Sequence, residues 1–273
     1  MTDWTALAVE ISEGVAQVTL IGPGKGNAMG PDFWRELPEV FGELDADPQV
    51  RAIVLTGAGK NFSFGLDLTA MGGLLDPVLG DDVKAAPRST FLGEIRRMQA
   101  AVTAVAKCAK PVVAAVSGWC VGGALDLVAA ADIRLASADA TFSLREAKVA
   151  IVADMGSLQR LPGIIGEGHL RELAYTAKDI DATRAEKIGL VNDVYDDRRA
   201  VLTAAHSLAR DIAVNPPLVV QGIKDVLETR TAASVAEGLR YVSTWNAAFL
   251  PSYDLAEGIA AVLQKRAPRF EGR

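Results

Sequence analysis

Hydrophobic and polar residues alternate in two short segments near the start of the chain, on either side of Glu13-Gly14. A period of two residues is typical of strands with one buried face, so these segments predict a β-hairpin. Two later runs, residues 51–57 and 110–118, are largely apolar and end in glycine. Such runs are typical of strands buried on both faces of a parallel sheet. The predicted strands lie at 9–11, 15–20, 51–57, 110–118, 133–136 and 141–144.

Apolar residues recur at helical spacing between and after these runs. Strand and helix patterns alternate as far as about residue 200, which predicts an α/β catalytic domain over residues 1–199. Residues 200–273 carry only helical patterns and predict a helical C-terminal region. Residues 71–89 are rich in Gly, Asp and Pro and predict a loop or a mobile cover. The predicted helices lie at 32–44, 90–109, 123–131, 200–213, 217–229, 234–249 and 254–265.

Composition narrows the class of protein. The 273 residues are 50% hydrophobic, which is enough for a large core, and the formal net charge of −6 argues against a nucleic-acid partner. Cys108 and Cys120 are too few for a disulfide framework and favour buried thiols. The longest uncharged run, between Lys110 and Asp126, is too short to span a bilayer. Because no targeting signal stands out, we expect a cytoplasmic protein without a membrane partner.

The sequence offers little for metal or nucleotide chemistry. Its two histidines, His169 and His206, lie far apart in polar surroundings, which disfavours a histidine-based triad or a zinc site. The glycine-rich segments at 22–27 and 57–61 lack the spacing of phosphate-binding loops. We therefore expect no metal and no nucleotide cofactor.

A pair of glycines and three acids are the candidates for chemistry. Gly122-Gly123 stands where a helix is predicted to begin, so backbone N–H groups there lack helical partners and suit a developing enolate oxygen. The same glycines are equally compatible with close strand–helix packing alone. Asp126 interrupts an apolar sequence on the same helix face as Gly123, and Glu146 and Asp154 bracket another apolar segment. Each acid by itself is also typical of a helix terminus or a solvated loop.

Five segments together resemble the crotonase (enoyl-CoA hydratase/isomerase) superfamily, over nearly the whole chain. They are residues 62–68 (FSFGLDL), 120–126 (CVGGALD), 156–166 (GSLQRLPGIIG), 185–191 (AEKIGLV) and 264–273 (QKRAPRFEGR). The resemblance implies an α/β crotonase-like spiral of ββα units with a helical C-terminal trimerisation region, assembled as a trimer or a hexamer. It also implies that the backbone N–H groups of Phe64 and Gly123 hold the thioester oxygen of an acyl-CoA. The coenzyme A-binding residues that it implies are Lys25, Asn27, Ala28, Phe62, Asp67 and Leu68.

The pattern of acids separates activities within this superfamily. Hydratases of 2-enoyl-CoA are expected to carry glutamates at the positions of Asp126 and Glu146, whereas here the first is aspartate and Asp154 is an additional acid. This trio resembles the Δ3,5-Δ2,4-dienoyl-CoA isomerases. The resemblance implies isomerisation of 3,5-dienoyl-CoA to 2,4-dienoyl-CoA in fatty-acid β-oxidation. Glu146 is then the base at C2, Asp154 the acid at C6, and Asp126 orients or tunes Glu146. No cofactor is needed, because coenzyme A enters with the substrate.

Two residues depart from the usual pattern of the superfamily. Phe64 is bulkier than the common alanine, although only its N–H is needed, and Trp119 could narrow the acyl channel. Near the C-terminus, Lys265 or Arg266 either contacts a coenzyme A phosphate or belongs to a solvated helix end.

Two other functions stay open at this point. One is a 2-enoyl-CoA hydratase in which Asp126 and Glu146 activate water. The other is a non-catalytic acyl-CoA-binding homologue that keeps only the oxyanion turns. Apolar residues of the helical C-terminal region also predict an interface of a trimer-based homo-oligomer. These residues are Val219, Val226, Leu227, Phe249 and Leu250.

Overall fold

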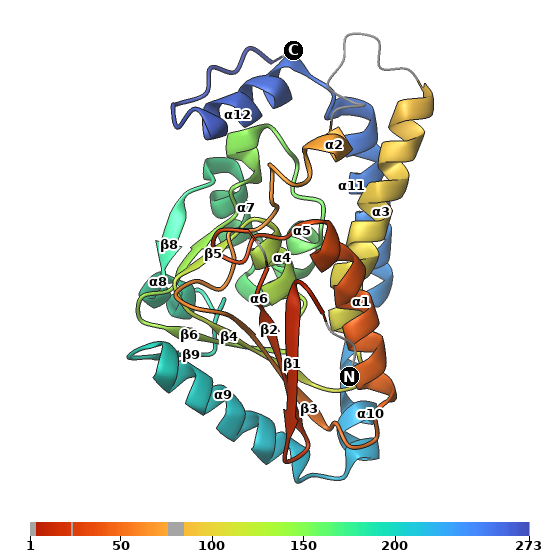
Figure 1. Cartoon of the computed structure of the whole chain (residues 1–273), viewed down its shortest axis with the longest axis vertical. Coiled ribbons are helices and arrows are strands. Elements are labelled where there is room, and N and C mark those ends of the chain that lie inside the picture. The colour runs from red at the N-terminus through yellow and green to blue at the C-terminus, as the bar shows by residue number, and fades with distance from the viewer. Residues whose placement is uncertain (1–3, 23, 76–84, 273) are drawn as a thin grey trace.

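The computed structural model describes residues 4–22, 24–75 and 85–272. A six-stranded sheet has the order β1-β2-β3-β4-β6-β9, and a three-stranded sheet has the order β5-β7-β8 (Figure 1). The strands are β1 (Leu7–Ser12), β2 (Val15–Leu20), β3 (Ala52–Gly57), β4 (Val112–Val116), β5 (Trp119–Val121), β6 (Ile133–Ser137), β7 (Thr141–Ser143), β8 (Asp179–Asp181) and β9 (Asp193–Tyr195).

Helices surround both sheets and form the C-terminal part of the chain. The longer ones are α1 (Pro31–Ala46), α3 (Ala85–Lys107), α7 (Glu167–Thr176), α9 (Arg198–Ala213), α10 (Pro217–Glu228), α11 (Ala232–Phe249) and α12 (Tyr253–Leu263). The shorter ones are α2 (Gly72–Leu75), α4 (Gly123–Ala129), α5 (Ser157–Arg160), α6 (Pro162–Ile165), α8 (Ala182–Lys187) and the 3₁₀ turn η2 (Glu146–Val149).

The large sheet is covered on both faces, which explains the apolar runs in its central strands. β1 and β2 pair antiparallel as the predicted hairpin, and the other pairs of this sheet are parallel. Along β3, Ile53 and Leu55 belong to the main core, whereas Ala52 and Val54 pack with residues of α9. Because successive side chains of a strand point to opposite faces, a strand covered on both sides needs apolar residues throughout.

Two turns that follow β3 and β4 lie against each other. Ser63 forms an isolated parallel bridge with Cys120, and Met29 forms another with Leu66. The Ser63 N–H donates to the carbonyl oxygen of Trp119, and the Val121 N–H donates to that of Ser63. These bonds join residues 61–68 to the start of α4, which is the region where the sequence predicts the oxyanion donors.

The C-terminal helices contact the segments that carry the predicted acids. α11 packs along α3 and contacts α5, and α12 contacts η2 (Figure 1). The predicted boundary at residue 199 falls within α9, and this helix packs on the sheet through Val201, Ala205 and Ala209. Helix α9 therefore packs with the sheet of the predicted catalytic domain, although most of its residues lie after the predicted boundary. The division of the chain into a catalytic and an oligomerisation region stays a prediction.

The predicted helices and the predicted strands of the large sheet are confirmed, with ends that differ by at most five residues. The strands β5, β8 and β9 and the helices α5, α6 and α8 were not predicted, because segments of three to six residues carry too little periodicity. The ten-residue helix α7 was missed as well. The predicted loop at 71–89 is helical at 72–75 and from residue 85, and its part at 76–84 lies outside the described residues.

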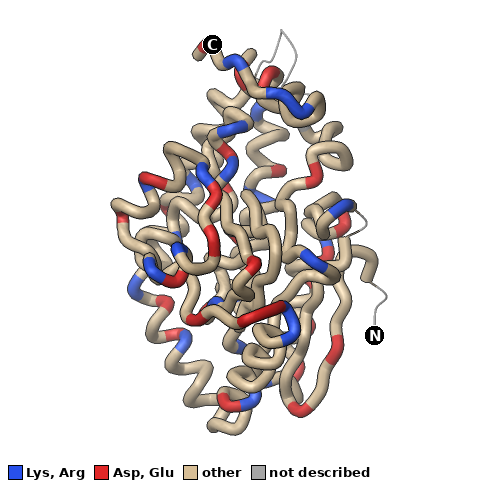
Figure 2. Tube along the Cα trace, turned by 90° about the vertical axis from the view of Figure 1, so that its left-hand side faces the viewer, with Lys and Arg blue, Asp and Glu red and all other residues tan. Residues whose placement is uncertain are grey.

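Side chains that were predicted to be inert have ordinary structural partners. Cys108 and Cys120 are buried free thiols. His169 contacts Arg184, and His206 lies 2.7 Å from Oε1 of Gln17. Acidic and basic residues are interspersed along the trace (Figure 2). Among the described helices, none is long and apolar enough to span a membrane.

Candidate active site

The first residue of α4 provides a backbone donor at the turn after β5. Gly123 has no acceptor for its N–H group within the described part of the chain, whereas the Gly122 N–H donates to the Ser143 carbonyl oxygen at 2.9 Å. A Cβ atom on Gly123 would lie 3.5 Å from Sδ of Met29 and 3.9 Å from the Trp34 ring. Gly123 therefore lies next to buried apolar side chains, and apolar surroundings strengthen a hydrogen bond to a developing negative charge.

The second predicted donor is engaged within the protein. The N–H of Phe64 donates to the carbonyl oxygen of Gly26 at 3.0 Å. Gly26 has a φ of +66°, and a Cβ atom there would lie 2.4 Å from the Phe64 ring. The expectation that this N–H is free is wrong for this conformation, because the turn at residues 24–28 folds back onto Phe64. Its role as an oxyanion donor stays a prediction.

Asp126 lies in the first turn of α4 and is buried. Its Oδ1 accepts a hydrogen bond from the Ser157 N–H at 2.5 Å, which ties α4 to the start of α5. Burial raises the pKa of Asp126, while the Ser157 hydrogen bonds and the positive charge of Arg160 act in the opposite direction. A carboxylate that accepts a buried N–H is well suited to fix neighbouring groups in place.

Glu146 begins η2, and its carboxyl group reaches the turn before α4. Its Oε1 lies 3.2 Å from the position that a Cβ atom of Gly122 would occupy. Its Oε2 is buried and has no hydrogen-bond partner among the described residues. Burial raises the pKa of Glu146 well above its ordinary value, and the charges of Asp126 and Asp154 raise it further. Such an oxygen is a candidate to exchange a proton with a bound substrate.

Asp154 is buried in the same group of acids and does not face the solvent. The side-chain amide of Asn246, from α11, donates to Oδ2 of Asp154 at 2.7 Å. Burial raises the pKa of Asp154 to about 7; the Asn246 bond opposes this rise, and the charge of Asp126 adds to it. The structure thus brings together the three acids that the sequence singled out, and at least one of them titrates near neutral pH.

The predicted coenzyme A-binding residues divide into exposed and internal ones. Lys25 is exposed, and Ala28 and Leu68 are half-buried, so these three can reach a ligand. Asp67 is also half-buried, and its Oδ1 accepts the N–H groups of Thr69 and Ala70 at the end of this turn.

Two residues of the predicted set are internal. Asn27 is buried, and its amide donates to the carbonyl oxygens of Ala58, Asn61 and Phe62. Phe62 is fully buried in the main core, and its N–H donates to the Ser117 carbonyl oxygen at 2.7 Å. The ring and the N–H group of Phe62 are therefore both engaged inside the protein, and the prediction that Phe62 contacts the ligand is wrong. The turn after β3 directs this residue inward. Asn27 serves the turn from within.

Trp119 is covered by a charged side chain. The guanidinium carbon of Arg145 lies 5.4 Å from the centroid of the Trp119 ring, and Arg145 also forms an ion pair with Asp179. The ring is thus held beside the residue that precedes Glu146. A narrowing of the acyl channel by Trp119 stays a prediction.

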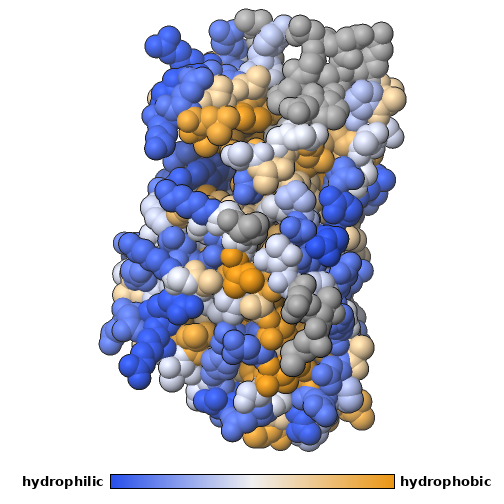
Figure 3. Space-filling model, in the orientation of Figure 1, coloured by the Kyte–Doolittle hydropathy of each residue, from blue (hydrophilic) through white to orange (hydrophobic). Residues whose placement is uncertain are grey.

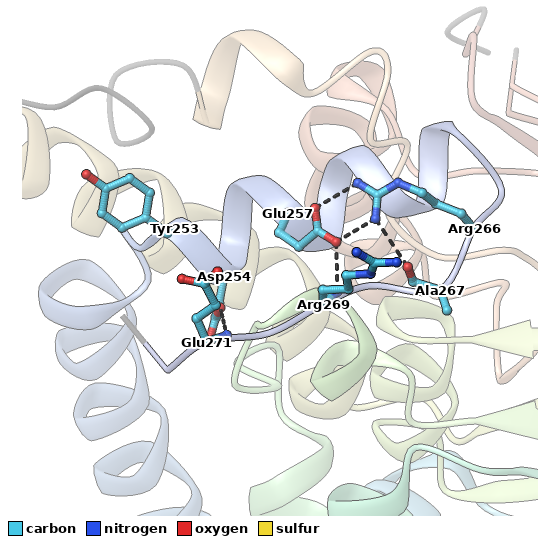
Figure 4. A pocket seen from close by; sticks show the side chains of 7 residues that line it. All are labelled: Tyr253, Asp254, Glu257, Arg266, Ala267, Arg269 and Glu271. Carbon is cyan, nitrogen blue, oxygen red and sulfur yellow. Dashed lines mark hydrogen bonds and ion pairs between the residues drawn. The ribbon is translucent and has the colours of Figure 1, made fainter.

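The C-terminal tail forms a separate hollow with α12 (Figure 4). Arg266 forms an ion pair with Glu257, and the N–H groups of Arg269 and Gly272 bind Glu257 and Asp254. The guanidinium group of Arg266 is therefore already neutralised, which favours the interpretation of a solvated helix end over a phosphate contact. Lys265 is exposed.

Three polar residues of the acid cluster were missed by the sequence analysis. Asn246 and Gln99 lie in helical patterns, where a polar residue normally faces solvent, yet both are buried. Arg160 lies in a segment quoted for the family resemblance, and its charge acts on Asp126. One signal could have revealed Asn246: it is a polar residue at a position where the helical period places an apolar one.

Comparison with known proteins agrees with this geometry. The enoyl-CoA hydratase/isomerase family model matches residues 10–273. The chain is 41% identical to the mitochondrial Δ(3,5)-Δ(2,4)-dienoyl-CoA isomerase of Dictyostelium discoideum, over 99% of the chain and 93% of that protein.

The chain belongs to the enoyl-CoA hydratase/isomerase family.

Other relatives of the family extend the likeness. The peroxisomal Δ(3,5)-Δ(2,4)-dienoyl-CoA isomerase of Arabidopsis thaliana is 42% identical over 91% of the chain and 89% of that protein. The crystal structure of an enoyl-CoA hydratase/isomerase from Xanthobacter autotrophicus Py2 superposes with a TM-score of 0.85 at 28% identity. That match covers 99% of this chain and 100% of the other. The predicted crotonase-like fold is confirmed, and within the family the chain is an isomerase.

Proposed function

We propose that the protein isomerises 3,5-dienoyl-CoA to 2,4-dienoyl-CoA by moving protons between carboxyl groups. The observation that carries this proposal is the position of Asp154. It is buried in one cluster with Glu146 and Asp126, and it is held there by Asn246. A proton shift from C2 to C6 needs two carboxyl groups along one acyl chain. In this cluster Glu146 is the first of these groups and Asp154 the second. The names of the relatives support the same substrate.

The order of the groups supports the assignment of the two proton-transfer sites. With the thioester oxygen at the Gly123 N–H, the Glu146 carboxyl group is close to the thioester, because its Oε1 lies 3.2 Å from the position of a Cβ atom on Gly122. C2 is the carbon next to the thioester carbonyl, so Glu146 is placed to remove its proton. The electrons spread over the conjugated dienolate as far as the thioester oxygen. Asp154 then delivers a proton at C6, which leaves the 2,4-diene.

Proton balance in this cluster fits such a shuttle. Burial raises the pKa of Glu146 well above its ordinary value and the pKa of Asp154 to about 7, which supports a shared proton between the two carboxyl groups. A pair that holds one proton offers one acid and one base, and each turnover ends with the proton on the other partner. Proton return through water or product restores the starting state. Asp126, tied to the Ser157 N–H, orients this arrangement. No further cofactor enters the scheme.

Substrate binding also completes the oxyanion site in this proposal. The Gly123 N–H is ready to receive the thioester oxygen, whereas the Phe64 N–H is bound to the Gly26 carbonyl oxygen. Exchange of that carbonyl oxygen for the thioester oxygen frees the second donor and shifts the turn that carries Lys25 and Ala28. Removal of one oxyanion donor typically costs about 100- to 1000-fold in kcat, so this exchange has a large effect on rate.

Exposed apolar residues of the tail support a homo-oligomer. Val219, Val226 and Leu227 of α10 and Phe249 of α11 are each more than half exposed. Hydrophobic residues gather at the surface over α12, at the upper left of Figure 3. Leu250 does not belong to this set, because it is only 5% exposed and packs into the main core; its assignment to an interface was wrong. We propose a trimer or a dimer of trimers in the cytoplasm, with a role in fatty-acid β-oxidation.

A spectroscopic assay tests the proposed reaction. The protein is incubated in parallel with a 3,5-dienoyl-CoA and with a 2-enoyl-CoA, and the ultraviolet absorbance is followed. Gain of the conjugated 2,4-diene absorbance with the first substrate is expected. Loss of the enoyl absorbance with the second, without reaction of the first, identifies a hydratase. A protein that binds both thioesters and changes neither is a non-catalytic homologue.

A further inference from the structure

A buried amide on a C-terminal helix holds one of the three acids. Asn246 lies towards the end of α11 and is only 1% exposed. Its Nδ2 donates both to Oδ2 of Asp154 at 2.7 Å and to the carbonyl oxygen of Val152 at 2.8 Å. The amide is thus anchored on the backbone two residues before the acid and binds one of the two carboxyl oxygens. The other oxygen, Oδ1, is left for a different partner.

A second amide fixes the backbone of the same acid. Nε2 of Gln99, from α3, donates to the carbonyl oxygen of Asp154 at 2.8 Å and to that of Leu239 in α11 at 3.1 Å. Gln99 therefore joins α3, α11 and the segment of Asp154, but it does not bind the carboxyl group. Gln99 thus binds the main chain of Asp154, and Asn246 binds its side chain.

The chemistry of the two amides differs in its effect on proton transfer. A side-chain amide neither takes up nor releases a proton near neutral pH, so Asn246 cannot replace an acid in the reaction. A donor to a carboxyl oxygen stabilises the ionised form, and it also fixes which oxygen points away from the donor. A donor to a backbone carbonyl oxygen does neither for the carboxyl group.

We propose that Asn246 is a positioning residue that binds Oδ2 of Asp154 so that Oδ1 is presented to the distal end of the acyl chain. This inference rests on the proposed isomerisation and extends it to a residue outside the three acids. It assigns the C-terminal helix α11 a part in the chemistry: α11 supplies the amide, and its exposed side carries Tyr241, Trp245 and Phe249.

The charged groups around Asp154 are few. Asp126 raises the pKa of Asp154 by its charge, Glu146 interacts with both aspartates, and Arg160 acts on Asp126. From α3 and α11, the groups bound to Asp154 are the neutral amides of Gln99 and Asn246. Removal of the Asn246 donor therefore leaves Asp154 with a higher pKa. Because the reaction needs Asp154 protonated, the alkaline limb of the kcat profile moves to higher pH.

The experiment compares Asn246→Leu with Gln99→Met, two changes that keep the size of the side chain and remove its donors. For Asn246→Leu we expect kcat to fall about tenfold or more below pH 7 with KM little changed. We also expect the alkaline limb of the kcat profile to shift by about one unit to higher pH, the usual effect of losing one hydrogen bond to a charged group. Gln99→Met is expected to leave the position of that limb where it is in the wild type. An unshifted limb in Asn246→Leu, or an equal shift in both variants, overturns the proposal.

A direct titration separates this inference from the proposed function. The Asp154 carboxyl group is followed by ¹³C NMR in labelled protein without substrate, with Asp154→Asn used to assign the signal. A higher titration midpoint in Asn246→Leu supports the contact between Asn246 and Asp154, whether or not the wild type isomerises a dienoyl-CoA. If the wild type does not isomerise a dienoyl-CoA, only the proposed function fails. An unchanged midpoint refutes the contact even if isomerisation is found. If Asn246→Leu does not fold, Asn246→Ala undergoes the same titration.

Discussion

Oε1 of Glu146 lies 3.2 Å from the point where a Cβ atom of Gly122 would stand, and Gly122 has a φ of +55°. Glycine is therefore favoured at this position on two grounds, the backbone conformation and the space that the carboxyl group occupies. The relationship couples the turn that ends in the free Gly123 N–H to the proposed base. The residue that binds the thioester oxygen, Gly123, therefore lies close to the residue proposed to remove the C2 proton, Glu146.

Gly122→Ala is expected to impair both catalysis and stability. Alanine at a φ of 55° and a ψ of −123° costs about 1–3 kcal/mol of folding free energy, and displacement of the Glu146 carboxyl group by a few tenths of an ångström is expected to lower kcat about tenfold. Thermal unfolding and kcat are measured together. Gly42→Ala is the control, since that helical glycine has nothing within 4 Å, and it should raise stability by up to about 1 kcal/mol. A Gly122→Ala enzyme with wild-type kcat contradicts the proposed place of Glu146.

Substitution of the two proton-transfer acids is expected to give different isotope patterns. Asp154→Asn keeps the shape of the side chain but cannot exchange a proton, so isomerisation falls by about 100- to 10000-fold. Exchange of the C2 proton with deuterated water survives, because Glu146 is intact. Glu146→Gln should abolish both exchange and isomerisation. If Asp154→Asn isomerises normally while Asp126→Asn and Glu146→Gln each abolish hydration of a 2-enoyl-CoA, the protein is a hydratase.

The stability of the protein should carry the signature of buried Asp154. Its pKa is raised from 3.8 to about 7 on folding, so between these values the folded state binds more protons than the unfolded state. The free energy of unfolding therefore decreases as pH rises through this window. Asp154→Asn lacks this dependence and should gain stability relative to the wild type between about pH 4 and pH 7. Denaturant titrations at several pH values measure the difference, and a constant difference contradicts the burial of an ionisable Asp154.

The turn over Phe64 can be tested with two glycines of similar conformation. Gly26 and Gly59 have φ values of +66° and +67°, so alanine strains the backbone equally at both. A Cβ atom at Gly26 would lie 2.4 Å from the Phe64 ring, whereas nothing lies within 4 Å at Gly59. We expect Gly26→Ala to strengthen the binding of an acyl-CoA about tenfold in calorimetry, because the turn can no longer close onto Phe64 and leaves its N–H free for the thioester oxygen. Equal affinities for the two variants argue against a role of this turn.

The proposed assembly predicts a mass of about 86 kDa, three times the 28.8 kDa protomer, or twice that value for a dimer of trimers. Sedimentation at micromolar concentration measures it. Val226→Glu and Phe249→Glu place charges on exposed apolar positions of α10 and α11 and should reduce the mass. Tyr175→Glu on α7, where the side chain is 75% exposed, is the control that should leave the mass unchanged. A wild type that sediments as a monomer excludes the assembly.

The amino-acid sequence by itself determined the large elements and the type of chemistry. Its period-two hairpin and its two apolar runs predicted the strands β1 to β4 of the large sheet, because a strand covered on both faces must be apolar throughout. Gly122-Gly123 indicated a helix start with free donors, and the spacing of Asp126, Glu146 and Asp154 indicated the isomerases of the family. These signals depend on residues close together in the chain, so they can be recognised from the sequence alone.

Tertiary structure alone decided which groups are free to act. Asn246 reaches Asp154 across 92 residues, and no local pattern predicts such a partner. The Phe64 N–H is bound to Gly26, and Phe62 and Leu250 point inward, because the packing of distant segments determines which side of a turn or helix end is covered. The pKa of each acid likewise depends on its burial and on charges brought together by folding. The sequence names the carboxyl groups, and the packing around them sets their protonation.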